Sequence, residues 1–154
     1  MFGAEPHARV LACAPSNEAT DLLALGLAEF VAERSVRMIR MNALMRNPRS
    51  VPSELQEFCM YEHGGFALPT VQDLSVEGPL LLVCTCISSA YLCSLGAERF
   101  THVFVDEAGE ALEPETLVPL VQVESDGVVM LSGDHKQLGP IVSSPAACEY
   151  RLDR

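Results

Sequence analysis

Two apolar segments that each run into acidic residues constrain the fold of this chain most strongly. Residues 100–105 (FTHVFV) lead directly into Asp106 and Glu107, and residues 128–131 (VVML) lead into Ser-Gly-Asp at 132–134. Short apolar runs of this kind are typical of strands buried inside a parallel sheet. Neighbouring parallel strands end at the same edge of their sheet. The pattern therefore predicts one sheet edge that carries both acidic groups.

The N-terminal part of the chain predicts a β-α-β unit. Residues 9–14 (RVLACA) form an apolar strand, which Pro15-Ser16-Asn17 ends. Ser16 or Asn17 is a suitable cap for the helix that follows, whose apolar residues keep helical spacing to about Glu33. A second strand is expected at 36–41. Such units build parallel sheets, so we expect an α/β fold with a mostly parallel sheet flanked by helices.

The remaining strands are separated by one segment of different composition. Residues 42–79 are rich in proline and glycine, and we interpret them as an excursion from the sheet within a single domain spanning 1–154. A short helix is expected from Ser53, where Ser53 and Gln56 fit a capping box. Residues 80–85 form the third strand, and 87–95 are expected to be helical. Pro114 suits the first turn of a further helix, which Pro119 is expected to end or bend early.

Composition limits the class of protein. The chain has 154 residues and a formal net charge of −11, which disfavours a domain that binds nucleic acid by itself. No apolar run approaches the roughly 18 residues of a membrane span, and the first residues do not resemble a signal peptide, so we expect a cytoplasmic protein. The six cysteines lack a Cys-x-x-Cys pair and lie mostly among apolar residues, which favours buried free thiols over a disulfide or zinc site.

One expected part of a nucleotide site is missing from the sequence. A strand that ends in Asp-Glu is typical of sites that hold Mg²⁺ and a water against a γ-phosphate. The phosphate-binding pattern G-x-x-x-x-G-K-[ST] is absent, and the only lysine, Lys136, lies in the loop GDHKQLGP. The chain therefore contains the metal and water half of such a site without the phosphate half.

Three blocks in a fixed order resemble the first RecA-like domain of superfamily 1 helicases. Their branch contains the nonsense-mediated-decay helicase and the Armitage-type RNA-silencing helicases. CAPSN at 13–17, with Ala19 and Asp21-Leu22-Leu23, is similar to motif Ia. VDEAGEALEPETLVPL from Val105 is similar to motif II, and GDHKQLGPIV from Gly133 is similar to motif III. VCTCISSA at 83–90 is similar to the strand and turn before motif II. The resemblance implies a partial RecA-like (P-loop NTPase) domain that spans nearly the whole chain.

The resemblance also implies roles at the acidic edge. Asp106 would hold Mg²⁺, with Glu107 beside it as a metal-site residue that polarises the attacking water. Gln137 would sense the γ-phosphate and share catalysis with Glu107. Gly133, Asp134 and Gln137 would join Asp106 in contacting the nucleotide, with ATP and Mg²⁺ as cofactors. The alternative for Asp106 and Glu107 is a solvated pair in a strand-end turn. Asp134 also has a simpler role, which is to accept bonds from loop N–H groups.

A second set of residues is implied to contact nucleic acid. Pro15, Ser16 and Asn17 would touch the sugar-phosphate backbone of single-stranded RNA, and Thr85 is a weaker candidate of the same kind. The simpler interpretation of Ser16 and Asn17 is a helix cap, and both roles are compatible. Nothing in these residues distinguishes RNA from DNA.

The leading hypothesis is a fragment of an ATP-dependent RNA helicase, which moves on single-stranded RNA in RNA silencing or RNA decay. The fragment lacks the phosphate loop and the second RecA-like domain, so we expect the isolated chain to be inactive and poorly soluble, with an unprotected sheet edge or face. Glu110 stands where these helicases often have glutamine and adds negative charge near the metal. The alternative is a non-catalytic truncated product that acts only through binding. A metal-dependent hydrolase using Asp106, Glu107 and Asp134 is a remote third option without suitable ligand spacing.

Overall fold

The computed structural model describes residues 7–134, 136, 139–140, 142 and 144–150. Its centre is a five-stranded sheet in the order β2-β5-β1-β6-β7. The strands are β1 (Arg9–Ala14), β2 (Arg37–Arg40), β5 (Leu80–Thr85), β6 (Phe100–Val105) and β7 (Val123–Leu131). Every pairing in this sheet is parallel. The predicted α/β class is thus confirmed, as a partial RecA-like fold.

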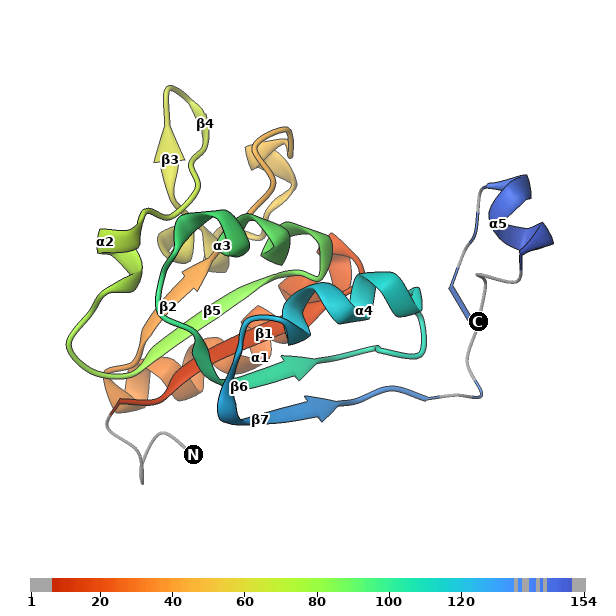
Figure 1. The fold of residues 1–154 in the computed structure, drawn as a ribbon. Coiled ribbons are helices and arrows are strands. Elements are labelled where there is room, and N and C mark those ends of the chain that lie inside the picture. Colours follow the sequence, from red (N-terminus) through yellow and green to blue (C-terminus); the bar gives the residue numbers. More distant parts are fainter. Residues whose placement is uncertain (1–6, 135, 137–138, 141, 143, 151–154) are drawn as a thin grey trace.

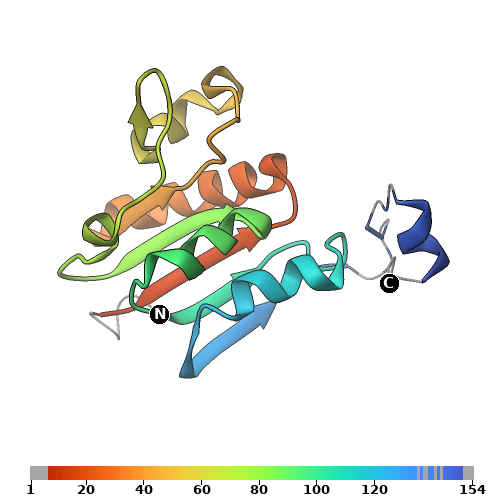
Figure 2. The ribbon, with the colours of Figure 1, turned by 45° about the horizontal axis from the view of Figure 1, so that its top comes forward.

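Helices cover the two faces of the sheet unequally. On one face, α1 (Asn17–Arg34) lies over β2, β5 and β1 (Figures 1 and 2). On the other face lie α2 (Val71–Leu74), α3 (Ala90–Leu95) and α4 (Glu113–Leu120). Successive side chains of each strand point to opposite faces of the sheet. Leu11 and Leu82 therefore join the core under α3, while Val10 and Leu81 join the core under α1. A last helix, α5 (Pro145–Glu149), lies away from the sheet.

The residues around β5 and β6 form the elements that the sequence predicts. A 3₁₀ turn η3 (Ile87–Ser89) leads into α3, as expected for 87–95. Pro114 lies in the first turn of α4, and the helix ends one residue after Pro119. The last strand, β7, is longer than predicted, since it begins at Val123 rather than at Val128. Its pairing with β6 contains a register shift between Phe100 and His102.

Residues 42–79 pack along the outer edge of β2, and they are called the excursion below (Figure 2). They contain the 3₁₀ turns η1 (Pro48–Ser50) and η2 (Ser53–Phe58), the hairpin β3 (Tyr61–Glu62) and β4 (Gly65–Phe66), and α2. Leu55 and Phe66 join the core under α1, and Leu74 joins the core on the opposite face. The excursion therefore shares its buried residues with the sheet.

The capping box predicted at Ser53 and Gln56 is wrong. The turn at Ser53 is a 3₁₀ helix without a side-chain cap, and the Ser53 hydroxyl donates to Glu54 Oε2 at 2.9 Å instead. The preceding Pro52 takes the N-cap position and has no side chain that accepts a hydrogen bond. A capping box does form at Thr70 and Asp73, at the start of α2.

The prediction of buried free thiols is confirmed for three of the six cysteines. Cys13, Cys84 and Cys86 are buried free thiols, and burial raises the pKa of Cys86 to about 12. Cys59 is half-buried and also free. The expectation of burial is wrong for Cys93, which is exposed. Within the described residues, no cluster of histidine, cysteine and acidic side chains is able to hold a metal through three ligands.

A buried charge cluster ties α1, β2 and the excursion together. Asp21 on α1 accepts hydrogen bonds from Arg40 on β2 and from Arg46 in the excursion, and all three side chains are at most 8% exposed. Burial opposes ionisation of Asp21, but the bonds from Arg46 and Arg40 outweigh it, and the pKa of Asp21 lies below its ordinary value of 3.8. The ionised form is therefore the one that the fold stabilises.

We predict that Asp21→Asn lowers the free energy of unfolding by about 3 kcal/mol at neutral pH, because it leaves two buried guanidinium groups without a counter-charge. The pKa of Asp21 is lower in the folded state than in the unfolded state. Its contribution is therefore complete above pH 3.8 and is lost as the pH falls through the folded value. Urea unfolding at pH 7 and at pH 3 checks this. A difference between Asp21→Asn and the unmodified chain that is as large at pH 3 as at pH 7 would contradict it.

The opposite edge of the sheet carries exposed apolar residues. On the outermost strand β7, Val128, Val129, Met130 and Leu131 are 43–53% exposed. No other described strand pairs with the outer side of β7. Such an edge is a site for self-association, because its N–H and C=O groups are unpaired and its side chains are apolar.

We predict that Val129→Lys reduces self-association of the isolated chain, because a charged side chain opposes edge-to-edge pairing. Sedimentation velocity at several protein concentrations measures the extent of self-association. Leu22→Lys is the matched control, since Leu22 is 71% exposed on α1 and lies outside the sheet. An equal reduction in both variants would place the associating surface elsewhere.

Candidate nucleotide and nucleic-acid site

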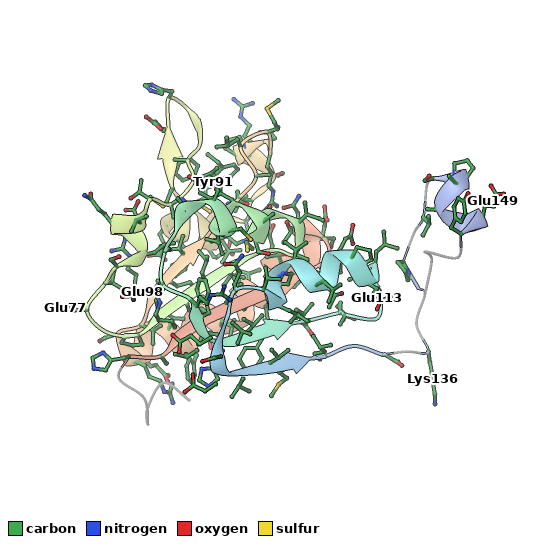
Figure 3. All side chains as sticks on the ribbon, in the orientation of Figure 1. Glu77, Tyr91, Glu98, Glu113, Lys136 and Glu149 are labelled. Carbon is green, nitrogen blue, oxygen red and sulfur yellow. The ribbon has the colours of Figure 1, made fainter. Side chains whose placement is uncertain are left out.

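The two acidic segments do meet at one edge of the sheet. In the parallel pairing of β6 with β7, Val105 lies opposite Leu131. The residues that follow, Asp106-Glu107 and Ser132-Gly133, therefore leave the sheet side by side. Figure 3 shows Glu113 and Lys136 at this end of the strands, and Glu77 and Glu98 at the opposite end. The predicted edge is thus present in the structure.

Hydrogen bonds fix the turn that follows Asp106. The Asp106 N–H donates to the Cys13 carbonyl at 2.8 Å, which anchors the end of β6 to β1. The Ala108 N–H donates to the Ser132 carbonyl at 2.7 Å, and the Ser132 N–H donates to the Val105 carbonyl at 2.8 Å. Both half-exposed carboxylates therefore leave a backbone that is held from two neighbouring strands.

Glu107 has a left-handed backbone conformation, with φ at 51°. A residue with a Cβ adopts this conformation at a cost of about 1 kcal/mol or more, and such residues cluster at functional sites. The Glu110 N–H donates to the Glu107 carbonyl at 2.9 Å and closes the tight turn. The sequence offers no signal for this feature, because glutamate has no preference for positive φ.

Gly133 lies where a larger residue does not fit. A Cβ at this position would lie 2.8 Å from the Gly109 nitrogen and 3.0 Å from the Ala108 nitrogen. The segment after β7 thus packs directly against the turn after β6. The next residue, Asp134, accepts a hydrogen bond from the Lys136 N–H at 2.9 Å, which is the loop-ordering role weighed for it from sequence. Gln137 lies outside the described residues, so its two predicted roles stay predictions.

The described acidic residues at this edge carry the oxygen ligands that Mg²⁺ prefers. Asp106, Glu107 and Asp134 supply carboxylate oxygens, and the described part of the edge offers neither histidine nor a cluster of three metal ligands. Mg²⁺ is commonly held by one or two protein carboxylates, with water and phosphate oxygens completing its coordination. A site with few protein ligands is therefore compatible with a metal that arrives with its nucleotide.

The predicted nucleic-acid residues lie at the same edge, nearer to β2. Ser16 is the N-cap of α1, and its side chain accepts from the Ala19 N–H at 3.1 Å. Thr85 ends β5 opposite Ala14, and its hydroxyl donates to Ser88 Oγ at 2.8 Å. The cap interpretation of Ser16 is confirmed. At the start of α1, Asn17 is half-buried and Glu18 is exposed, and the first N–H groups of a helix have no partner within the helix.

An apolar groove runs along the uncovered part of the α1 face. It lies between α1 and strands β6 and β7, and it encloses a volume of about 370 Å³. The groove ends at Asp106 and Ser132. The other lining residues are all apolar: Val10, Ala12, Leu23, Leu27, Phe30, Leu81, Phe104, Val105 and Met130. One face of β6 and β7 is thus left without a covering helix in the described part of the chain.

Comparison with known proteins agrees with this geometry. A family described as an AAA domain matches residues 71–145. The chain is 35% identical over 151 residues to RNA helicase Mov10l1 of Mus musculus, a match that covers 96% of this chain and 12% of that protein. It is 39% identical over 150 residues to the putative helicase mov-10-B.1 of Danio rerio, covering 94% of this chain and 14% of that protein. It is also 32% identical over 155 residues to a probable helicase with zinc finger domain of Homo sapiens. That match covers 96% of this chain and 8% of that protein.

These matches support the class that the motifs indicate. Together they support a superfamily 1 helicase fragment that corresponds to a partial RecA-like segment. It spans about one eighth of the length of the mouse relative. No helix in the described ranges combines the length and the apolar character needed to cross a bilayer.

We predict that Gly133→Ala destabilises the chain by about 1–3 kcal/mol, because the new methyl group collides with backbone at Ala108 and Gly109. Urea unfolding measures the change. Gly139→Ala is the matched control, since nothing lies within 4 Å of its added Cβ. A Gly133→Ala variant as stable as Gly139→Ala would show that the two loops are not in contact.

Proposed function

We propose that this chain forms the metal and water half of an ATPase site in the first motor domain of an RNA helicase. The observation that carries the proposal is the placement of Asp106 and Glu107 beside Ser132 and Gly133 at the ends of two paired parallel strands. Acidic side chains at this position suit the hydrolysis of a nucleoside triphosphate. The helicase family of the chain supports ATP as that nucleotide.

Each residue at the edge has a proposed task. Asp106 holds Mg²⁺, and Glu107 orients the attacking water and accepts its proton. Bound Mg²⁺ would neutralise the charge that develops on the γ-phosphate. Asp134 orders its loop so that Gly133 and Gln137 contact the nucleotide, and Gln137 senses the γ-phosphate. Glu110 is exposed and adds a negative charge that repels the neighbouring carboxylates and the triphosphate, which weakens nucleotide binding and activity.

The phosphate half of the site comes, in this proposal, from an adjoining segment of the parent protein. A strand would pair with the bare side of β7, and a helix would fill the apolar groove between α1 and β7. Since the groove ends at Asp106, one end of that helix would lie at the acidic edge. A helix N-terminus there would supply N–H groups and a favourable dipole for phosphate. The second RecA-like domain would add its arginines from outside the chain.

The turn from Pro15 to Asn17, together with Thr85, is proposed to contact the backbone of single-stranded RNA. Exposed N–H groups and short polar side chains bind phosphate and sugar without reading base sequence. ATP hydrolysis would thereby drive movement along RNA in the cytoplasm, in a silencing or decay process. The isolated chain would be inactive. A non-catalytic product that acts through binding is the second candidate, and the exposed apolar groove is the observation that favours it.

We predict that Glu107→Gln in the full-length parent keeps Mg²⁺–ATP binding but lowers turnover at least about 100-fold, because the amide cannot accept the proton of water. Steady-state phosphate release and nucleotide binding by fluorescence titration measure the two quantities. Glu110→Gln is the nearby control, and it should keep turnover and raise rather than lower the affinity for the anionic nucleotide. Unchanged turnover in Glu107→Gln would remove this residue from the mechanism.

A further inference from the structure

Asp21 belongs to the block that resembles motif Ia, yet the proposed function gives it no task. It follows the N-cap Ser16 by five residues, inside the first turns of α1. Its carboxylate accepts four hydrogen bonds from two guanidinium groups. Arg40 donates from Nε at 3.0 Å and from Nη2 at 2.8 Å, and Arg46 donates from Nη1 at 3.0 Å and from Nη2 at 2.5 Å.

Arg46 connects this carboxylate to the loop after β2. Its Nη1 also donates to Asn42 Oδ1 at 2.7 Å, and its Nε donates to Ser50 Oγ at 3.2 Å. One guanidinium group thus bonds to both ends of the segment 42–50 and to α1. The Arg46 side chain is 8% exposed, so its bonds to Asp21 and Asn42 are partly shielded from water and are worth more than surface contacts, whereas its bond to Ser50 is exposed.

The cluster lies beneath two loops at the carboxyl edge of the sheet. The strand order places the ends of β2, β5 and β1 side by side. The loop 43–50 follows β2, Thr85 ends β5, and the turn 15–17 follows β1. Because Asp21 anchors the helix that starts at this turn, its bonds to Arg46 fix the position of the loop 43–50 relative to the turn.

Charge and exposure make this loop suitable for a polyanion. Two guanidinium groups and one carboxylate give the cluster a charge of 2 − 1 = +1, in a chain whose formal net charge is −11. Arg49 on the same loop is exposed. Leu44 and Met45 at the tip are 54% and 96% exposed and offer apolar surface for an unstacked base or sugar.

We propose that Asp21, Arg40 and Arg46 are positioning residues for single-stranded RNA, and that they hold the loop 43–50 beside the turn 15–17 so that both form one contact surface. This inference rests on the proposed function, because it extends the same RNA-contacting edge toward β2. It assigns Asp21 a task other than contact with RNA, since its oxygens already accept bonds from both arginines.

The experiment measures RNA affinity in the full-length parent protein. Asp21→Asn and Arg46→Gln are each titrated with a fluorescent oligouridylate, with anisotropy as the readout. We expect each to weaken RNA binding about fivefold or more, and the double variant to be no weaker than the stronger single one, because both remove the same connection. The affinity for Mg²⁺–nucleotide without RNA should change less than twofold.

Arg9→Gln is the matched control for a merely structural effect. Arg9 is similarly buried, but it lies at the opposite end of β1, where it donates to the carbonyls of Leu74, Glu98 and Arg99. It should lower the melting temperature while leaving RNA affinity unchanged. Arg46→Lys keeps the charge but not the planar fork, so we expect it to remain weak in RNA binding.

Each outcome supports or overturns the inference. If Asp21→Asn and Arg46→Gln lower the melting temperature as Arg9→Gln does and bind RNA normally, the cluster is only structural. If Arg46→Lys restores full affinity, charge rather than position is responsible. A wild-type parent that does not bind RNA would overturn the proposed function and this inference together, whereas failure of the inference alone appears only in the variants.

Discussion

The parallel pairing of β6 with β7 is the constraint on which the candidate site depends. With Val105 opposite Leu131, the turn after Asp106 lies against Gly133, and backbone bonds join the two loops. In a sheet whose side chains alternate between faces, a slip of one residue would send every side chain of β7 to the other face. The register of β6 against β7 therefore determines where the carboxylates of Asp106 and Glu107 lie. The two residues themselves supply the acidic groups.

The two edges of the sheet differ, and the difference agrees with a chain that is part of a larger fold. At β2, the excursion packs its own apolar residues against the sheet and ties Arg46 to Asp21. At β7, both the edge and the adjacent groove remain apolar and open in the described residues. Parallel sheets normally have both faces covered. Asp106 lies among the lining residues of the groove, so in the proposed function a segment that covered this side would also reach the proposed nucleotide site.

Much of the fold can be predicted from short stretches of sequence, because an apolar run predicts a buried strand and a capping residue predicts the start of a helix. The strand 9–14, the Ser16 cap and the strand that ends at Asp106 are of this kind. The start of β7 at Val123 was missed, since its first residues include polar Glu124, Ser125 and Asp126. The cluster of Asp21 with Arg40 and Arg46 could not be predicted either. Its members are 19 and 25 residues apart in sequence, and only the assembled sheet brings them together.

Glu107 connects the stability of this edge to its chemistry. A residue with a side chain at φ 51° is strained, and glycine would relieve the strain. The conformation persists because the Ala108 N–H bonds to Ser132 and the Glu110 N–H bonds back to Glu107, so the neighbouring strand and the turn both hold it. The strain thus falls on the same position that the helicase resemblance gives to the water-activating carboxylate. A sequence selected for stability alone has no reason to place a glutamate there, whereas a site that must aim a carboxylate away from the strand direction does.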